Sequence, residues 1–300
     1  EDQVFQIPVS NATGYARFTQ NGGRIESNTI EALVRGIIIE TPEFTWNATV
    51  NFSRTRSTVV TMPDGIDEIS FGGDPAGTVA NRVVKGGAVG DLWGYDLTRN
   101  SAGKLVINQT TGLPFLKDSL VLVGNAFPDA QLGFTNTFTW NGLSLSFFLE
   151  WRIGGVAVDM AERNGYRNGV TGFTDVRYVQ VMFDGVAPDG SPNTVPGYLD
   201  PTTFWRAGVN SSKYFNIQDA SWIRLRNVSL SYALPKSLLE GSVLKSVGIT
   251  LAGNNLWLNT PFRGYDPDAL AYGSGTNIYG LVGRNTPALR SFTFGFNLGF

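Results

Sequence analysis

The chain has 300 residues, of which 42% are hydrophobic, 12% aromatic and only 16% charged. That charged fraction is below the roughly 25% typical of soluble domains, and much of the remaining polarity comes from Ser, Thr, Asn and Gly. A formal charge of -2 offers no basic surplus for a phosphate backbone, which argues against a nucleic-acid partner. Cysteine and histidine are absent, so disulfides, thiol chemistry and the commonest general base are excluded.

The first two elements are long strands. Residues 24–40 are predicted to form one long strand with imperfect alternation, followed by a tight turn at residues 41–43. Residues 44–60 then form a strand far longer than the roughly 5–6 residues of an average one. In its first half, apolar and polar residues alternate strictly, with Phe44, Trp46, Ala48, Val50 and Phe52 on one face.

The middle of the chain adds further strands and a second tight turn. Residues 131–140 and 143–151 alternate around Asn141-Gly142, a strong two-residue hairpin signal, with Phe148 as the exception to the pattern. Two short turns are expected at the same end of the strands, which requires an even number of strands between them. The four strands predicted there are residues 44–60, 89–98, 104–108 and 131–140.

Residues 154–220 form a loop rich in aromatics, with a short helix predicted over residues 156–166. Exposed aromatics can stack on sugars or anchor a partner protein. Tyr166, Arg167 and Trp205 are therefore the candidate contacts for substrate or partner. Packing of these aromatics within the loop itself is an equally good interpretation.

The last third contains three more predicted strands. Residues 221–234 form a strand of mixed facing, residues 237–240 one helical turn, and residues 246–252 an alternating strand. After a long loop over residues 259–286, the chain ends in an alternating strand at residues 291–300. Its apolar side resembles the assembly signal of outer-membrane barrels, and consists of Phe292, Phe294, Phe296, Leu298 and Phe300. About nine strands are expected in all.

These patterns indicate an all-β fold, and two interpretations compete. In a soluble β-sandwich, acting as a lectin or adhesin, the apolar face would pack on a second sheet. In a transmembrane antiparallel β-barrel it would face lipid, and short turns would alternate with long extracellular loops, as here. The small, uncharged polar faces and the length of the strands favour the barrel. Tryptophans near the strand ends are expected to form its interfacial girdles, namely Trp46, Trp140, Trp151, Trp222 and Trp257.

Ordered motifs along nearly the whole chain resemble the SusC/RagA family, the TonB-dependent outer-membrane transporters of Bacteroidetes. The first set comprises Asn21 to Asn28, Gly90 to Tyr95 and Gly124 to Pro128. The second set comprises Ser221 to Pro235, Gly253 to Trp257, Gly264 to Asp268 and Thr286 to Phe300.

The resemblance implies a barrel of about 22 strands with a plugged lumen, in contact with outer-membrane lipids. It also implies a SusD-like surface lipoprotein as lid and energy coupling through TonB, ExbB and ExbD. The cargo would be an oligosaccharide or a peptide. Residues 1–300 are expected to be the C-terminal part of the barrel, with the N-terminal strands, the plug and the TonB box outside them. A passive porin is a further alternative.

No constellation of catalytic residues is visible, so the sequence does not predict an enzyme, and no cofactor is expected. Carboxylates in Gly/Pro-rich turns could hold a structural calcium ion, but without EF-hand spacing turn formation is the better explanation for Asp184, Asp189, Asp266 and Asp268. Arg54 and Arg56 lie at the outer end of a strand, where they could pair with lipopolysaccharide phosphates or simply be solvated.

Overall fold

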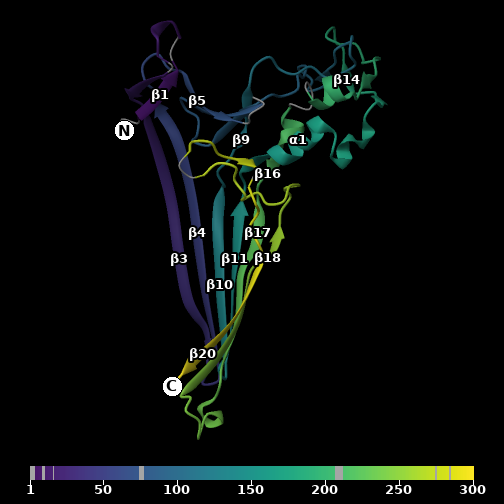
Figure 1. Ribbon diagram of the computed structural model, residues 1–300. Helices are drawn as coiled ribbons and strands as arrows, with labels where there is room; N and C mark the ends of the chain where they lie inside the picture. The colour runs from purple at the N-terminus through teal and green to yellow at the C-terminus, as the bar shows by residue number, and fades with distance from the viewer. Residues whose placement is uncertain are drawn as a thin grey trace.

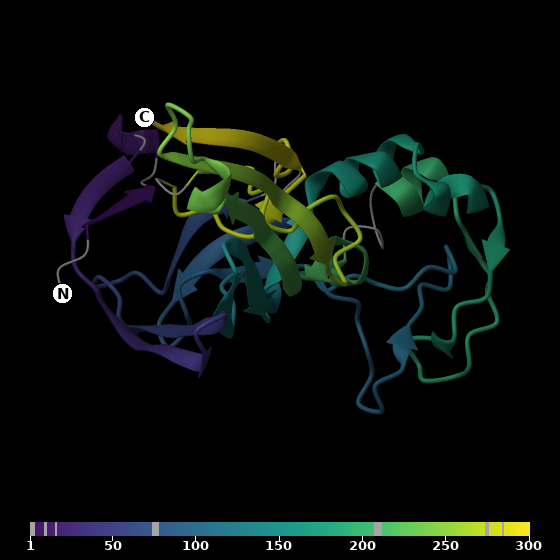
Figure 2. The same cartoon turned by 90° about the horizontal axis from the view of Figure 1, so that it is seen from below.

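The structure is a computed structural model that describes residues 4–8, 11–15, 17–73, 78–206, 212–273, 276–283 and 285–300. Its central element is a seven-stranded antiparallel sheet, called the main sheet, with the order β20-β18-β17-β11-β10-β4-β3. The strands are β3 (Arg24–Glu40), β4 (Phe44–Thr61), β10 (Ala130–Trp140), β11 (Leu143–Ile153), β17 (Trp222–Ala233), β18 (Ser246–Asn259) and β20 (Ser291–Gly299). The strands run side by side, and in the view from below the sheet is curved (Figures 1 and 2).

Both predicted tight turns are confirmed, and they lie at the same end of the main sheet. At the β10–β11 turn, Asn141 and Gly142 have φ angles of 44° and 82°, the two positive values that a type I′ hairpin requires. At the β3–β4 turn, the backbone N–H of Thr41 donates to the carbonyl of Phe44 at 2.8 Å. The register is continuous between the turns, because Phe44 pairs with Trp140 and Trp140 pairs with Leu143.

The prediction of four strands between these turns is wrong, since only β4 and β10 lie there in the main sheet. Residues 89–98 contribute β7 (Asp91–Gly94) to a separate four-stranded sheet, and residues 104–108 contribute the two-residue β8 (Leu105–Val106). Their apolar side chains fill a local core instead of facing lipid, with Leu92 and Ile107 each 0% exposed. The expected nine strands are accordingly reduced to seven in the main sheet.

Three long segments, residues 62–129, 154–221 and 260–290, gather at the other end of the main sheet and are called the cap (Figure 1). The four-stranded sheet consists of β5 (Glu68–Gly73), β6 (Val79–Val84), β7 and β9 (Val121–Asn125). A three-stranded sheet joins two cap segments through β12 (Val156–Asp159), β16 (Ile217–Asp219) and β19 (Leu281–Val282). The pairs β8 with β14 (Gly185–Val186) and β13 (Gln180–Val181) with β15 (Gly197–Tyr198) complete the cap sheets. Outside the cap, β1 (Val4–Pro8) pairs with β2 (Arg17–Asn21).

The cap also carries the helical segments. They are α1 (Met160–Asn168), η2 (Gly172–Val176), the π-helical η3 (Pro201–Arg206) and α2 (Lys213–Asn216). The helix predicted over residues 156–166 begins later than expected, because residues 156–159 form β12 and the Asp159 carboxylate caps the helix by accepting from the backbone N–H of Ala161 and Glu162. At the end of the molecule opposite the cap, η5 (Lys236–Leu238) follows β17, close to the predicted helical turn. The remaining short helix, η1 (Asn11–Thr13), lies between β1 and β2 along the chain. None of the helices in the described residues is both long and apolar enough to cross a membrane.

The hairpin geometry makes a stability prediction. A Cβ at position 142 would lie 2.8 Å from the carbonyl oxygen of Ala233, in addition to the strain of a positive φ. Gly142→Ala should therefore lower the free energy of unfolding by more than the ~1–2 kcal/mol that positive φ alone costs. Gly190→Ala is the control, because Gly190 has a φ of 87° and no neighbour within 4 Å of its added Cβ. Urea unfolding of the full-length protein measures both, and equal losses would contradict the packing argument.

Candidate functional site

The main sheet has an apolar face and a polar face. Residues directly opposite one another on paired strands lie on the same face, so the register joins the alternating patterns of six strands, from β4 to β20. In β3 the pattern is imperfect, since Leu33 and Ile37 lie opposite Asn51 and Asn47 on the polar face. The apolar face includes Phe44, Trp46, Val50, Phe52, Leu132, Phe134, Phe138, Leu145, Phe147, Leu149, Val228, Leu230, Ile249, Leu251, Phe294 and Phe296.

No second layer covers this apolar face among the described residues. Phe294 and Phe296 are 61% and 63% exposed, and Trp140 near the tight turns is 55% exposed. A soluble sandwich would bury these rings against an opposing sheet. The soluble sandwich is therefore not supported, because it requires a second sheet over the apolar face. The one polar side chain in the middle of the face, Asn136, accepts a hydrogen bond from Trp46 Nε1 at 3.0 Å.

Trp222 does not belong to the predicted aromatic girdle. It pairs with Arg152 on the polar side and is only 3% exposed, because cap residues cover it. Trp151 and Trp257 remain exposed on the apolar face at the cap end of their strands. The girdle remains a prediction for Trp46, Trp140, Trp151 and Trp257.

The polar face is a ladder of small hydrogen-bonding side chains. Thr137 and Ser146 hydroxyls lie 3.2 Å apart, and those of Ser231 and Thr250 lie 3.1 Å apart. Phe148, the exception in the sequence pattern, is also explained. A Cβ at Gly133 would lie 2.9 Å from the Phe148 ring, so the ring covers the glycine of the neighbouring strand. A surface of this kind is wettable yet carries little charge.

At the cap end of the polar face, two separate sequence motifs meet. Arg224 of β17 donates to both carboxylate oxygens of Asp266, at 3.1 and 2.5 Å, and the two side chains are 2% and 5% exposed. Arg226 pairs with Glu150 of β11 and, at 2.9 Å, with Asp268. The Ser221 to Pro235 and Gly264 to Asp268 motifs are therefore two halves of one arginine–carboxylate cluster. It fixes the last cap segment to the wall of the sheet.

The ring of Trp222 lies between these two arginines. The guanidinium carbons of Arg224 and Arg226 are 4.8 and 5.1 Å from the ring centre, distances at which cation–π attraction contributes. The interaction explains why a tryptophan occupies a buried position on a polar face.

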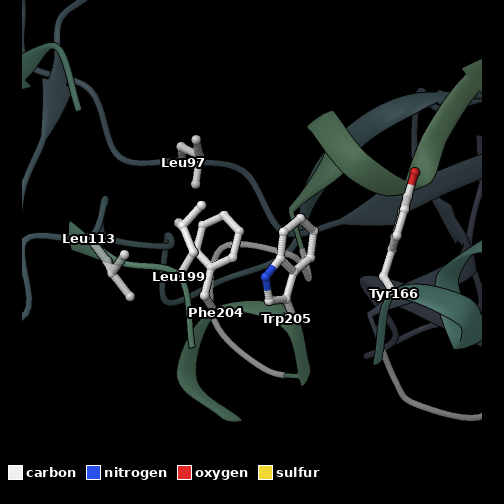
Figure 3. Close-up of a cluster of buried hydrophobic side chains, with 6 residues drawn as sticks. All are labelled: Leu97, Leu113, Tyr166, Leu199, Phe204 and Trp205. Atoms are coloured by element: carbon white, nitrogen blue, oxygen red, sulfur yellow. The ribbon is translucent and has the colours of Figure 1, made fainter. Parts of the chain in front are cut away.

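The structure buries Tyr166 and Trp205 within the cap, as expected if the loop aromatics pack on each other. The two side chains are 2% and 3% exposed and belong to a cap core that also contains Leu97, Leu113, Leu199 and Phe204 (Figure 3). Burial of this kind leaves neither ring free to stack on a ligand. Arg167 is half-buried, and its role as a contact remains a prediction.

A second polar cluster ties three parts of the cap together. Glu162 of α1 accepts from Nε and Nη2 of Arg263, both at 3.0 Å, and from Nε2 of Gln218 at 2.6 Å. Burial, together with the hydrogen bond to Glu162, raises the pKa of the Tyr166 hydroxyl above its usual value. The hydrogen bond to Glu162 likewise raises the pKa of Arg263. The cluster therefore keeps a neutral tyrosine and a charged arginine throughout the physiological range.

The four candidate calcium carboxylates do not converge on one another. Asp266 and Asp268 pair with arginines, and Asp189 accepts from the backbone N–H and the hydroxyl of Ser191. Within the ranges that the structure describes, no group of three or more acidic, His or Cys side chains could hold a metal ion. Turn formation accounts for Asp189, and ion pairing for Asp266 and Asp268.

Two cavities lie where the cap meets the main sheet. One of about 620 Å³ lies beside the upper part of β4 and is lined in part by Arg54, Arg56 and Asp129. The other, of about 440 Å³, lies beside the upper part of β18 and is lined in part by Trp257 and Tyr265.

Sequence comparison finds relatives among known proteins, although no protein-family profile matches the chain. The chain is 26% identical over 326 aligned positions to TonB-dependent receptor P3 of Formosa agariphila, and 25% identical over 329 positions to TonB-dependent receptor P26 of the same species. Each alignment covers 100% of the chain. The chain is therefore similar over its whole length to TonB-dependent receptors. These are outer-membrane proteins that form a class of transporters, not enzymes.

Structural comparison shows which known fold the chain shares. The chain superposes on a chain of the RagAB peptide importer in its open-open state with a TM-score of 0.70 and 18% identity. The closed-closed state gives 0.70 and 17% identity. The resemblance predicted from the sequence is confirmed as a similarity in sequence to TonB-dependent receptors and in fold to a RagAB chain. The chain spans about 31% of the length of receptors P3 and P26, and 31–32% of the RagAB chains.

The buried arginine–carboxylate pair makes a stability prediction. Asp266→Asn would leave the Arg224 charge buried without a counter-charge, which typically costs 3–5 kcal/mol. Asp268→Asn is the matched control, because Asp268 is 38% exposed and Arg226 keeps Glu150. Thermal unfolding of the full-length receptor in detergent should show a large loss for the first variant and a small one for the second. Similar losses for both would contradict the special role of the buried pair.

The cap core makes a second prediction. Trp205→Ala should open the core around Phe204 and Tyr166, since removing a buried Trp costs about 3–5 kcal/mol. Limited proteolysis should then cut within residues 154–220 at lower protease concentrations. Arg167→Ala should leave the digestion pattern unchanged, because Arg167 lies outside that core. An unchanged pattern for both variants would argue against the core.

Proposed function

We propose that this chain forms part of the barrel wall of a TonB-dependent importer, with its apolar face against lipid and its polar face toward the transport lumen. The observation that carries the proposal is the main sheet itself, since its apolar face is uncovered and its polar face is small, hydrogen-bonded and poor in charge. Lipid-facing and lumen-facing residues alternate in this way in membrane barrels.

The orientation follows from the lengths of the connections. Outer-membrane barrels have short periplasmic turns and long extracellular loops. The turns after β3 and β10 therefore face the periplasm, and the cap faces the exterior, where it is positioned to receive cargo. A connection of intermediate length that includes η5 lies on the periplasmic side with them.

The barrel requires strands beyond the main sheet. The outer edges of β3 and β20 have no partner strand among the described residues, and unpaired backbone groups are not tolerated in lipid. Receptors three times as long as this chain have ample length for the remaining strands, a plug and the TonB box. We place residues 1–300 in the C-terminal part of such a barrel of about 22 strands. The apolar side of β20, from Phe292 to Leu298, serves as its assembly signal.

The cargo and partners follow from the resemblance to the RagAB peptide importer. We propose a peptide or an oligosaccharide as cargo, a SusD-like lipoprotein as lid, and TonB with ExbB and ExbD as energy source. The polar face, with its hydroxyls and amides, is chemically compatible with either cargo.

Uptake by cells tests this function. A strain that lacks the full-length receptor should fail to take up its peptide or oligosaccharide, and the restored gene should rescue uptake only when TonB is present. A passive porin would rescue uptake without TonB, which separates that alternative from an active importer. Uptake assays with a peptide library and with a glycan library would identify the class of cargo.

A matched pair of substitutions tests the assignment of the two faces. Phe134 and Thr135 are neighbours on β10 but lie on opposite faces. Phe134→Arg places a charge in the middle of the lipid-facing side, at a cost of about 2–4 kcal/mol, and should lower the amount of folded receptor in the outer membrane. Thr135→Arg should be tolerated in a wet lumen. Heat-dependent migration on gels measures the folded fraction, and the reverse order of effects would refute the assignment.

A further inference from the structure

The apolar face of β4 ends abruptly in two arginines. Residues 44–52 supply the apolar side of the strand, and nine residues correspond to the roughly 9–11 that a tilted strand needs to cross a bilayer. Arg54 and Arg56 follow on the same face, because they continue the alternation from Phe52. They therefore lie immediately beyond the hydrocarbon boundary on the side of the cap.

The register relates these arginines to an exposed tryptophan of the same sheet. Phe52 lies in one row with Leu132 and Trp151, and the Trp151 ring is 40% exposed on the apolar face. Exposed tryptophans of membrane barrels lie at the level of the lipid headgroups. Arg54, paired with Ile30, is one row further out than Trp151 and so lies at the depth of headgroup phosphates.

The two arginines differ in their partners. Among the described residues, no carboxylate pairs with Arg54, whose side chain is exposed. Arg56 pairs with Asp129, and its Nη1 donates to the carbonyl of Pro128 at 3.4 Å. The Arg56 and Asp129 side chains are 46% and 61% exposed, and an ion pair exposed to this extent is weak. A phosphate can compete for Arg56, while repulsion by Asp129 makes Arg54 the stronger anchor.

A cavity lies directly beside the pair. Because β4 extends well beyond Ala130, the first residue of β10, one edge of its upper part borders on cap residues, while β3 pairs with the other edge (Figure 1). The space there measures about 620 Å³ and is lined by both arginines, by the hydroxyl residues Ser53 and Thr55, and by Phe127. This volume is in the range of small-molecule sites, so a phosphorylated sugar can fit, with apolar surface next to it for a lipid chain.

We propose that Arg54 and Arg56 bind the phosphate of a phosphorylated glycolipid of the outer leaflet, with the sugar in the adjacent cavity and the acyl chains along the apolar face. The proposal rests on the proposed function, since it requires the apolar face to contact lipid and the cap to face outward. The planar guanidinium fork suits phosphate oxygens, and two forks on one strand face can hold one headgroup. The lipid anchors the outer rim of β4 beside the cap.

Binding of lipid A to the purified full-length receptor in detergent tests the proposal, with native mass spectrometry as readout. Phosphorylated lipid A and its dephosphorylated form are compared on the wild type, on Arg54→Gln and on the Arg54→Gln/Arg56→Gln double variant. Arg35→Gln is the matched control, because Arg35 pairs with Thr49 on the opposite, polar face of the same two strands. Arg54→Lys tests whether charge alone is sufficient.

We expect the double variant to bind phosphorylated lipid A at least tenfold more weakly than the wild type, because it loses two charge-assisted contacts. Arg35→Gln should bind normally, Arg54→Lys should lose part of the affinity, and dephosphorylated lipid A should bind weakly to every variant. Equal binding of both lipids, equal losses in Arg35→Gln and the double variant, or displacement of the lipid by inorganic phosphate at similar concentration would overturn the proposal.

Heat-dependent gel migration of the wild type is measured first. Its absence would refute the proposed function, whereas its presence with unchanged lipid binding would refute the lipid site alone.

Discussion

A backbone amide in hydrocarbon has no water to bond with, so every strand in a membrane must pair on both edges. In the proposed barrel, that constraint would act on every strand of the main sheet. Pairing in register brings most apolar residues of β4, β10, β11, β17, β18 and β20 onto one face and most hydroxyl residues onto the other. It also requires tight connections on one side, such as Asn141-Gly142, and permits long ones on the other. The exposed rings of Phe294 and Phe296 and the small polar ladder behind them follow from this single requirement.

The cap builds a core of its own, as expected for a part that lies in water in the proposed barrel. Its strands are short, and its apolar residues point inward, as Leu92, Ile107 and Trp205 do. Two polar clusters connect this core to its surroundings. Arg224 and Arg226 fix the last cap segment to the main sheet through Asp266 and Asp268, and Glu162 joins α1 to Gln218 and Arg263. In the proposed receptor, these clusters would hold the extracellular segments in place over the lumen.

The sequence predicted the main sheet well where period-two alternation was long and uninterrupted. The alternation leaves only a strand as the interpretation of Phe44 to Phe52 and of Phe292 to Leu298. The glycine at position 142 likewise indicates only a hairpin turn. It failed for residues 89–98 and 104–108, because a short apolar run looks the same whether it faces lipid or a cap core. The burial of Tyr166, Trp205 and Trp222 depends on contacts between residues far apart in the chain. Trp222, for example, packs against arginines that Asp266 and Asp268 hold in place. A local sequence pattern contains no information about such contacts. In the sequence, these two motifs were separate stretches, and nothing indicated that they form one site.

The pairing of Arg224 with Asp266 and of Arg226 with Asp268 sets the limits of an exchangeable module. β17 and the segment near residue 266 are separated along the chain by the whole of β18, yet each supplies half of the same charge cluster. A chimaera that receives only the outermost loop from another receptor would combine the arginines of one protein with the carboxylates of another. Grafts intended to change what such a receptor accepts should therefore carry the strand and the loop as one unit.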